Sequence, residues 1–313
     1  MRLYLRFDTI GVVKTVVFLY GSVEPLRVDF EPIKKQGTIM EPSALRKVQL
    51  AQLEIAKEIK RVCEENDIEY FLDSGTLLGA VRHRGFIPWD DDMDFGMTRE
   101  AYERFLQIAP RALREEFHIQ TWETDPYFPQ PFCKVCKKNT SYVETLTQYS
   151  KSSRELFVDV FPYNVYPDAK WKRWRQKYGC KFYRRLLDRK CGYCRWASRR
   201  GLRRFMKILQ SLPSILLAPF FSKEFLRRRC EALMTKYNGE TSEFVCAQTG
   251  VYGRWVVPKK CARGDLKLRF EDDDFACPSE YDAYLTAVYG DYMTPPPMDQ
   301  RENKHAVLEV QID

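Results

Sequence analysis

The sequence lacks any apolar run long enough to cross a lipid bilayer. A spanning helix needs about 20 consecutive apolar residues. The nearest approach, residues 208–221, is shorter and is broken by Pro213 and Pro219. The N-terminal run of residues 12–20 is also short, contains Lys14 and has no small-residue cleavage site, so it does not fit a secretory signal. We therefore expect neither a membrane-spanning helix nor a signal peptide.

The sequence also lacks the dense, evenly spaced cysteine framework of small secreted domains. Its ten cysteines include two Cys-x-x-Cys pairs, Cys133/Cys136 and Cys191/Cys194, which lie too far apart for a common zinc module. The first pair falls in an expected strand, where residues i and i+3 point to opposite faces. The pattern favours reduced thiols in a cytoplasmic protein over a structural zinc site.

Internal repeats are absent, but the charge is unevenly distributed. The composition, with 44% hydrophobic and 14% aromatic residues, is typical of a folded soluble protein and excludes a disordered one. Residues 171–230 hold 19 Lys and Arg against only Asp188 and Glu224, a net charge of +17, so the rest of the chain carries −9 of the total of +8. This pattern indicates an acidic core and a basic insert that meets an acidic partner.

The hydrophobic pattern predicts a mixture of helices and strands. Apolar residues recur at helical spacing over 43–66, and Thr98 with Glu100 marks the start of another helix over 98–108. We expect one or two strands in residues 1–33, a basic helical stretch over 169–237, a helix near 279–289, and extended segments at 68–72, 92–95, 118–122, 132–136 and 156–161. The last of these strands is expected to stop at Pro162.

Three carboxylates precede or lie within the strand expected at 92–95. Residues two apart on a strand share a face, so Asp90, Asp92 and Asp94 are expected side by side. Such carboxylates repel one another unless a cation lies between them, and a divalent metal that holds phosphate oxygens is the usual cation. The preceding Gly75-Thr76 turn opens a helix, whose N-terminus can approach a phosphate closely.

Two further charged residues lie inside otherwise apolar strands. Asp159 in residues 156–161 is costly to bury unless it is paired or binds a metal, which makes it the best candidate for a third carboxylate. A turn-capping Asp is the alternative. Lys134, inside residues 132–136, needs an anionic partner, and a phosphate-binding role is balanced against that of a plain surface lysine.

The segment Gly-Thr-Leu-Leu-Gly-Ala-Val-Arg-His-Arg-Gly-Phe-Ile-Pro-Trp-Asp-Asp-Asp-Met-Asp-Phe-Gly-Met, residues 75–97, closely resembles the signature of the LicD family of phosphotransferases. That family includes bacterial phosphorylcholine transferases and the eukaryotic fukutin-related proteins. Residues 132–141, 156–162 and 280–293 are similar to further blocks of the family. The resemblance covers roughly residues 45–168 and 235–306.

The resemblance implies an α+β fold of the nucleotidyltransferase type, a mixed sheet flanked by helices, here with a basic helical insert. We divide the chain into an N-terminal β-rich extension (1–42), a catalytic core (43–168), the insert (169–234) and the C-terminal part of the catalytic domain (235–313). The implied reaction moves a phospho-alcohol, such as phosphocholine, from a CDP-alcohol donor to a sugar hydroxyl of a glycan or lipid-linked glycan, and releases CMP.

The resemblance also assigns roles to residues. It makes Asp92 and Asp94 ligands of Mg²⁺, with Mn²⁺ as the alternative ion, and makes Asp159 either a third ligand or the base for the incoming hydroxyl. Gly75 and Thr76 would cradle the donor phosphate. The other implied phosphate or acceptor contacts are Arg82, His83, Lys134 and His305. From its place in the sequence, Asp90 is an auxiliary ligand, base or substrate contact, whereas Asp91 is expected to face the other way and to serve structure.

Other readings of the sequence stay open. A nucleotidyltransferase that modifies a small molecule with an NTP and a non-catalytic adaptor that binds a membrane or polymer are the alternative functions. For the basic insert, an anionic membrane surface or an acidic glycan phosphate is favoured over simple solvated helices. Nucleic acid is disfavoured because no recognised nucleic-acid fold accompanies the insert. The expected location is cytoplasmic and peripheral, at the inner face of the cell membrane.

Overall fold

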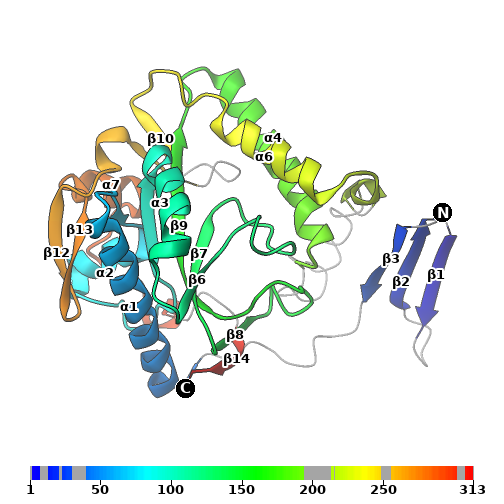
Figure 1. Ribbon diagram of the computed structural model, residues 1–313, viewed down its shortest axis with the longest axis horizontal. Coiled ribbons are helices and arrows are strands. Elements are labelled where there is room, and N and C mark those ends of the chain that lie inside the picture. The colour runs from blue at the N-terminus through cyan, green and yellow to red at the C-terminus, as the bar shows by residue number, and fades with distance from the viewer. Residues whose placement is uncertain are drawn as a thin grey trace.

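The computed structural model describes the strands at 2–7, 13–20 and 23–29 together with residues 40–193, 213–214, 216–247, 255–301 and 307–312. Its largest sheet is mixed and has the order β11-β10-β9-β5-β4, with β7 paired to both β9 and β6 (Figure 1). The long strand β9 (Leu156–Val165) runs parallel to β5 (Asp94–Thr98) and antiparallel to β7 and β10. The predicted α+β class with a mixed sheet is confirmed.

Helices cover one face of this sheet. In β7 (Cys133–Lys137) the residues Cys133, Val135 and Lys137 share a face, because side chains alternate along a strand. Lys137 forms an ion pair with Glu54 on α1 (Pro42–Glu65), and Cys133 contacts Tyr102 on α3 (Arg99–Ala112). The helices α1 and α3 therefore bury this face, and the opposite face carries Lys134 and Cys136.

The remaining elements surround the sheet (Figure 1). Beside it lie α2 (Ser74–His83), α7 (Tyr281–Tyr289), the hairpin of β12 (Leu266–Phe270) and β13 (Asp273–Cys277), and the pair of β8 (Ser141–Glu144) and β14 (Val307–Gln311). The shorter sheet strands are β4 (Phe71–Leu72), β6 (Phe117–Gln120), β10 (Phe244–Cys246) and β11 (Val256–Pro258). Three single 3₁₀ turns, η1 (Ala218–Phe220), η2 (Lys259–Cys261) and η3 (Met298–Gln300), complete the described elements.

The N-terminal residues form more strands than the sequence pattern indicates. β1 (Arg2–Phe7), β2 (Val13–Tyr20) and β3 (Val23–Asp29) pair antiparallel in that order as a three-stranded sheet. One or two strands were expected there. The second and third strands pair antiparallel from Thr15↔Asp29 to Tyr20↔Val23.

The periodicity that predicts the helix before the acidic motif, and the N-cap that predicts the helix after it, agree with the structure. The predicted helix over 43–66 is α1, and the predicted helix over 98–108 is α3, whose N-cap Thr98 accepts a hydrogen bond from the Ala101 N–H. The helix α3 continues to Ala112, past Pro110 near its end. The predicted opening of a helix near Gly75-Thr76 is confirmed by α2.

The prediction that the strand after Leu156 stops at Pro162 is wrong, since β9 continues to Val165. Pro162 pairs with Met97 of β5 on one side. On its other side, the pairing with β7 ends at Val160 and the pairing with β10 begins at Asn164. The proline falls in this interval between two partner strands, a place where a missing N–H costs the ladder little.

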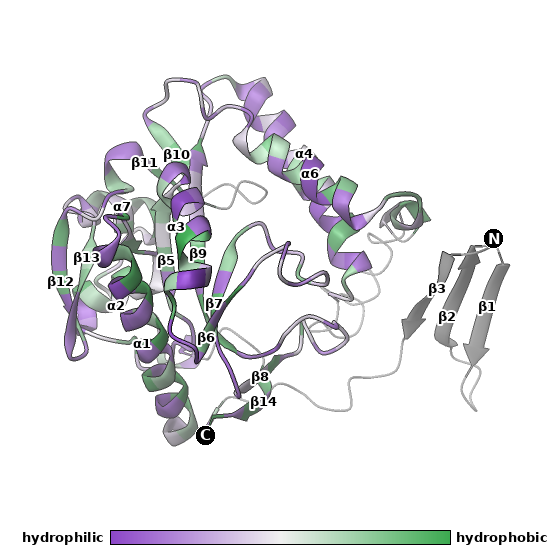
Figure 2. Ribbon diagram, in the orientation of Figure 1, coloured by the Kyte–Doolittle hydropathy of each residue, from purple (hydrophilic) through white to green (hydrophobic). Residues whose placement is uncertain are grey.

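Two antiparallel helices make up the described part of the basic insert, α4 (Lys170–Lys190) and α6 (Lys223–Thr235). Figure 2 shows hydrophilic and hydrophobic segments alternating along both. Within the described residues, the structure contains no helix that is long and apolar enough to span a bilayer. The nine described cysteines are free and buried; Cys194 and residues 195–212 lie outside the described residues.

A buried carboxylate ties α1 to the segment after α3. The Glu58 side chain is 1% exposed and accepts hydrogen bonds from Arg61 at 2.7 Å and from the Arg114 side chain at 2.9 Å. It also accepts one from the Arg114 backbone N–H at 2.8 Å. Burial alone would raise the pKa of Glu58, but these hydrogen bonds outweigh burial and lower it.

We predict that Glu58→Gln lowers the free energy of unfolding by about 3 kcal/mol at neutral pH, because two arginines lose a buried anionic partner. Urea denaturation measures the loss. Because the folded-state pKa of Glu58 lies below its unfolded value, its stabilisation is present above the unfolded pKa and disappears as pH falls through the folded one. The control Glu65→Gln, an exposed pair partner on the same helix, should change stability by less than about 0.5 kcal/mol. An equal effect of both variants would contradict the assignment.

Candidate active site

The carboxylates of the acidic motif lie where the chain enters β5. Only Asp94 belongs to the strand, and residues 90–93 are the end of the loop 84–93 that precedes it. The predicted strand alternation of Asp90, Asp92 and Asp94 is therefore wrong, because a loop has no two-residue period. The loop instead brings carboxylate oxygens of Asp90, Asp91 and Asp92 within 4.8 Å of one another. Asp91 thus lies in the cluster. The sequence pattern predicted that Asp91 would point away from it, and that prediction is wrong.

Two glutamines on α1 hold this loop in place. Gln49 donates a hydrogen bond to the Asp90 carbonyl oxygen at 2.9 Å, and Gln52 donates one to the Asp91 carbonyl oxygen at 3.0 Å. Both glutamines are buried, at 4% and 1% exposure. On the other side, the Tyr142 hydroxyl donates to the Asp91 carboxylate at 3.1 Å. Burial, followed by the charge of Asp91, raises the pKa of this tyrosine, so it stays a neutral donor.

The start of the loop is fixed by Glu271, in the turn between β12 and β13. Its backbone N–H donates to the Arg84 carbonyl oxygen at 2.8 Å, and its carboxylate accepts from the Phe86 N–H at 3.2 Å. Arg46 of α1 binds the same carboxylate through two hydrogen bonds, of 3.0 Å and 2.6 Å. A Cβ at Gly85 would lie 2.6 Å from this carboxylate, so a larger residue there would displace the Glu271 side chain.

Asp94 and Asp159 lie side by side on the face of the sheet opposite α1 and α3. They are direct partners in the parallel pairing of β5 and β9, and Lys134 of β7 is the partner of Asp159 on its other side. The Lys134 ammonium lies 3.6 Å from the Asp159 carboxylate and 3.0 Å from the centre of the Phe157 ring. The structure therefore brings two of the predicted carboxylates and the predicted lysine into one row, in which Lys134 already has an anionic partner.

The predicted trio of Asp92, Asp94 and Asp159 does not form a compact set of ligand atoms. Two groups of three such side chains come within 4.8 Å in the described part of the chain. One is the Asp90–Asp91–Asp92 cluster, and the other, His118, Cys136 and Glu155, was not predicted. Asp92 belongs to the first, while Asp94 and Asp159 form the adjoining row.

The first turn of α2 forms a hydrogen bond with the backbone of Asp94. The Thr76 hydroxyl is buried and accepts a hydrogen bond from the Asp94 backbone N–H at 2.8 Å. Gly75 lies buried in the same turn. The residue before the first residue of α2, Asp73, is the N-cap of this helix. Its carboxylate accepts hydrogen bonds from the hydroxyls of Tyr163 and Tyr284. Complete burial raises the pKa of Asp73, which the two tyrosines and Ser74 oppose.

The end of α2 places a basic and aromatic group beside the acidic loop. Arg82 donates to the His83 ring nitrogen Nε2 at 3.0 Å and to the Tyr292 carbonyl oxygen at 2.7 Å. Burial, and then the charge of Arg82, lowers the pKa of His83, so this histidine is a neutral acceptor. The Trp89 ring lies edge-on to His83 and under Arg301, whose guanidinium is 5.1 Å from it.

A cavity of about 440 Å³ lies on this side of the loop. Gln49, Trp89 and Arg301 line it together with Arg46 and apolar side chains. Its cationic and aromatic lining lies next to the carboxylate loop, as a phosphate-bearing ligand requires. His305, predicted as a contact, lies outside the described residues.

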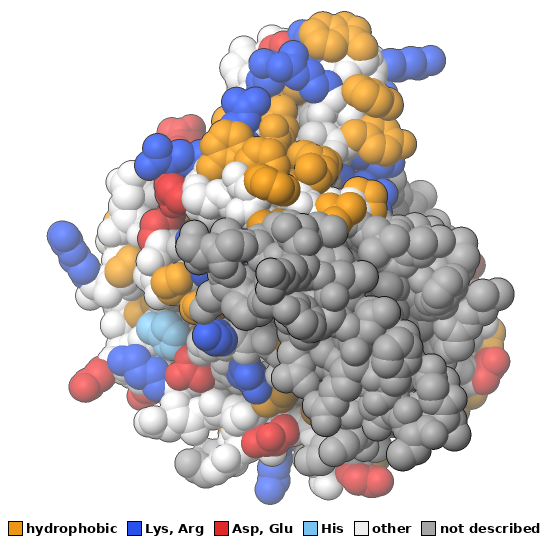
Figure 3. All heavy atoms as spheres, turned by 90° about the vertical axis from the view of Figure 1, so that its right-hand side faces the viewer, with side chains coloured by type: hydrophobic (Ala, Val, Ile, Leu, Met, Phe, Trp, Pro, Cys, Tyr) orange, Lys and Arg blue, Asp and Glu red, His pale blue; other side chains and the backbone are white. Residues whose placement is uncertain are grey.

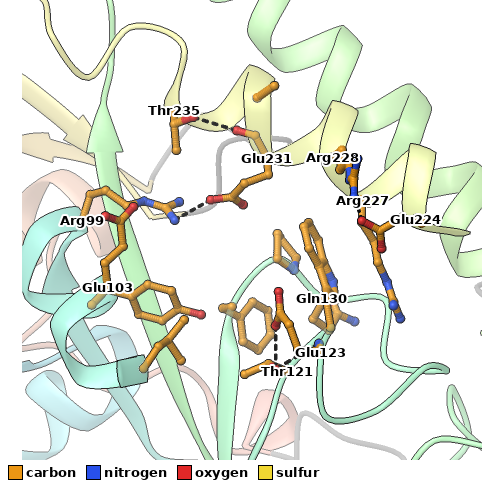
Figure 4. Close-up of a pocket in the computed structure, with 16 residues that line it drawn as sticks. Arg99, Glu103, Thr121, Glu123, Gln130, Glu224, Arg227, Arg228, Glu231 and Thr235 are labelled. Atoms are coloured by element: carbon orange, nitrogen blue, oxygen red, sulfur yellow. Dashed lines mark hydrogen bonds and ion pairs between the residues drawn. The ribbon is translucent and has the colours of Figure 1, made fainter. Parts of the chain in front are cut away.

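A second cavity, of about 550 Å³, lies at the other end of the sheet between α3, the segment after β6 and α6 (Figure 4). Arg99 and Glu231 point toward one another across it and form an ion pair of 2.7 Å. Burial raises the pKa of Glu231, and the negative charges of Glu103 and Glu123 raise it further. Arg99 lowers this pKa but does not outweigh them. None of the predicted site residues lines this cavity.

Sequence reasoning missed the residues that hold the site. Gln49 and Gln52 are polar positions on the buried side of an amphipathic helix, which was a usable signal because buried amides need partners. Asp73 precedes a helix start, as an N-cap does. Glu271 and Arg301 carry no local signal, because their contacts are made with residues far away in the sequence.

Comparisons with known proteins agree with the motif resemblance. Residues 67–191 match the family model described as LicD/FKTN/FKRP, nucleotidyltransferase domain. The chain is 28% identical over 272 residues to the lipopolysaccharide cholinephosphotransferase LicD of Haemophilus influenzae, which covers 85% of this chain and 97% of that protein. It is 38% identical over 95 residues to the ribitol 5-phosphate transferase FKRP of Mus musculus, covering 30% of this chain and 18% of that protein. An uncharacterized protein of Rickettsia prowazekii, RP689, is 43% identical over 119 residues, or 38% of this chain and 41% of that one.

We predict that Thr76→Val lowers the free energy of unfolding by about 1–3 kcal/mol, because the shape is kept while the buried Asp94 N–H loses its acceptor. Thr76→Ser keeps the hydroxyl and should lose clearly less. Urea denaturation of both variants measures the difference. Equal losses would show that the hydroxyl bond contributes nothing beyond packing.

Proposed function

We propose that this chain, a transferase of phosphate-containing groups with a LicD-family domain over residues 67–191, moves a phospho-alcohol from a CDP-activated donor to a sugar hydroxyl of a glycan or lipid-linked glycan. The matched relatives are named as cholinephosphotransferase and ribitol 5-phosphate transferase. Phosphocholine is therefore the first head group to test. The observation that carries the proposal is the Asp94–Asp159–Lys134 row, within the matched domain and beside the acidic loop.

The donor set fits a hard divalent cation. The nearby ligands are all carboxylate oxygens, and those of Asp90, Asp91 and Asp92 lie within 4.8 Å of one another. Such oxygen-only sets suit Mg²⁺ or Mn²⁺. We propose Asp92 and Asp94 as its ligands, which requires the Asp92 side chain to turn from its cluster toward the Asp94–Asp159 row. Asp159 is the third ligand or the base, and Asp90 and Asp91 add negative charge beside them. When bound, the cation would neutralise charge on the phosphate oxygens.

The side chains then divide the remaining work. The sugar oxygen forms the new bond to phosphorus while the bond to the CMP oxygen breaks, and the hydroxyl proton passes to a carboxylate, for which Asp159 is the candidate. Arg82 and Arg301, next to the loop, supply positive charge for the donor phosphates. Lys134, 3.6 Å from the Asp159 carboxylate, adds a positive charge in the same row.

A panel of CDP-choline, CDP-ethanolamine, CDP-ribitol and CDP-glycerol, each with a glycan acceptor and Mg²⁺, tests the function. We expect CMP release with at least one donor. Consumption of an NTP with release of pyrophosphate would instead identify a nucleotidyltransferase that acts on a small molecule. The absence of turnover with every donor, together with retained membrane or polymer binding, would identify a non-catalytic adaptor.

We predict that Asp94→Asn and Asp159→Asn each lower the rate of CMP release by at least about 1000-fold, because each removes a negative oxygen from the row where charge is transferred. Thermal unfolding should show that both variants stay folded. The control is Asp274→Asn in the β13 strand, whose side chain is 56% exposed and which should keep full activity. Full turnover in either site variant would remove that residue from the mechanism.

Metal dependence is tested by chelation. We expect EDTA to abolish CMP release and added Mg²⁺ or Mn²⁺ to restore it, while Ca²⁺ restores less because it prefers more ligands at longer distances. Isothermal titration of Mn²⁺ into Asp92→Asn should show binding at least about tenfold weaker than in the unchanged protein. Unchanged affinity would mean that Asp92 is not a ligand.

A further inference from the structure

The exposed face of α4 is built from only two kinds of side chain. Eight residues of this helix are exposed, and none of them is acidic. Four are aromatic, Trp171, Trp174, Tyr178 and Phe182, with exposures of 61%, 66%, 48% and 43%. The other four are basic, Lys170, Arg175, Lys181 and Arg185. We call these eight residues the α4 face.

Helical geometry turns this set into a stripe. The aromatic residues are spaced by three, four and four positions, so at about 100° per residue they fall within an arc of roughly 80°. Lys170 and Lys181 lie on one side of this arc and Arg175 on the other, while Arg185 extends it at the C-terminal end. The α4 face therefore has an aromatic centre with basic side chains beside it, along a helix of about 30 Å.

Within the described residues, the helix packing of α4 lies on its other side. The opposite side of α4 carries the packing: Gln176 donates hydrogen bonds to backbone carbonyl oxygens of α6, and Cys180, Leu186 and Leu187 are fully buried. Large apolar side chains are often exposed singly, but a contiguous row of aromatic residues marks an interaction surface. The α4 face is thus available to a partner without loss of helix packing.

The apolar surface continues beyond α4. The ring of Phe182 lies 5.3 Å from that of Tyr183, which lies 6.4 Å from Phe225 on α6. Next to these, Phe220 is 72% exposed and Phe225 is 41% exposed. Figure 3 shows this gathering of hydrophobic side chains with Lys and Arg among them over the upper part of the molecule.

We propose that the α4 face docks the protein on the surface of an anionic lipid bilayer. Trp, Tyr and Phe bury apolar rings at the level of the lipid headgroups, while Lys and Arg beside them reach the lipid phosphates. The absence of exposed acidic side chains on α4 leaves nothing on this helix to repel an anionic surface. A helix that lies in the plane of the interface in this way would keep the enzyme next to a lipid-linked acceptor. Docking itself does not depend on the transfer reaction.

Sedimentation with vesicles tests the proposal on the full-length protein. We expect binding to vesicles of phosphatidylcholine and phosphatidylglycerol in equal amounts, little binding to phosphatidylcholine alone, and a loss of binding as salt is raised. The double variant Trp171→Ala and Trp174→Ala should bind at least about tenfold more weakly. The double variant Lys181→Gln and Arg185→Gln should bind about 25-fold more weakly, since each basic residue near the surface contributes about fivefold.

The control is Leu50→Ala, an apolar residue on α1 that is 44% exposed and lies outside the α4 face, which should bind vesicles like the unchanged protein. All variants should keep CMP release with a soluble acceptor, because the α4 face touches no site residue. Equal binding by the tryptophan variant and the control would overturn the proposal. So would a dimer that dissociates in the tryptophan variant without any vesicle binding, since the face would then join two copies of this chain. A failure of CMP release in the unchanged protein would overturn the transfer reaction but not the docking.

Discussion

The site depends on a loop that holds buried carboxylates close to one another. Asp90 and Asp91 would repel each other and the adjacent Asp92, and burial makes that repulsion stronger. The structure opposes it with backbone anchors, because Gln49 and Gln52 bind the carbonyl oxygens of the loop and leave its carboxylates oriented toward one another. A loop held in this way would present its carboxylates, already close together, to the cation that we propose.

The same loop explains why distant parts of the chain are needed for one small site. Glu271 from the β12–β13 hairpin and Arg46 from α1 fix its first residues, and Thr76 from α2 fixes its last. The parallel pairing of β5 with β9 then adds Asp159, and β7 adds Lys134. The site is therefore assembled from α1, α2, the hairpin and three strands, so a small shift of the hairpin or of α1 would alter the whole site.

The sequence could predict the composition of the site better than its geometry. The acidic motif, Asp159 and Lys134 were found because charged residues in apolar strands need partners, and the strand pairing does place the last two with Asp94. The alternation of Asp90 and Asp92 failed because the strand begins only at Asp94. The helices were predicted to within a few residues from periodicity and caps. The end of β9 was not, because the effect of Pro162 depends on which strands flank it, and that is a tertiary property.

Anchors such as Glu271 and Arg301 lie beyond any local pattern, since their partners are far away in the chain. The same limit, that a local pattern does not show which residues pack together, applies to the basic insert. Its net charge of +17 indicated an acidic partner, but charge alone cannot separate a solvated helix from a docking surface. The structure separates them through burial: the inner side of α4 packs on α6, which leaves the aromatic and basic side chains together on the outer side. The acidic loop gathers negative charge in the core, while the insert presents positive charge and aromatic rings at the surface. These two opposite charge patterns are the basis for the two tasks that we propose, phosphate transfer in the core and attachment at the periphery.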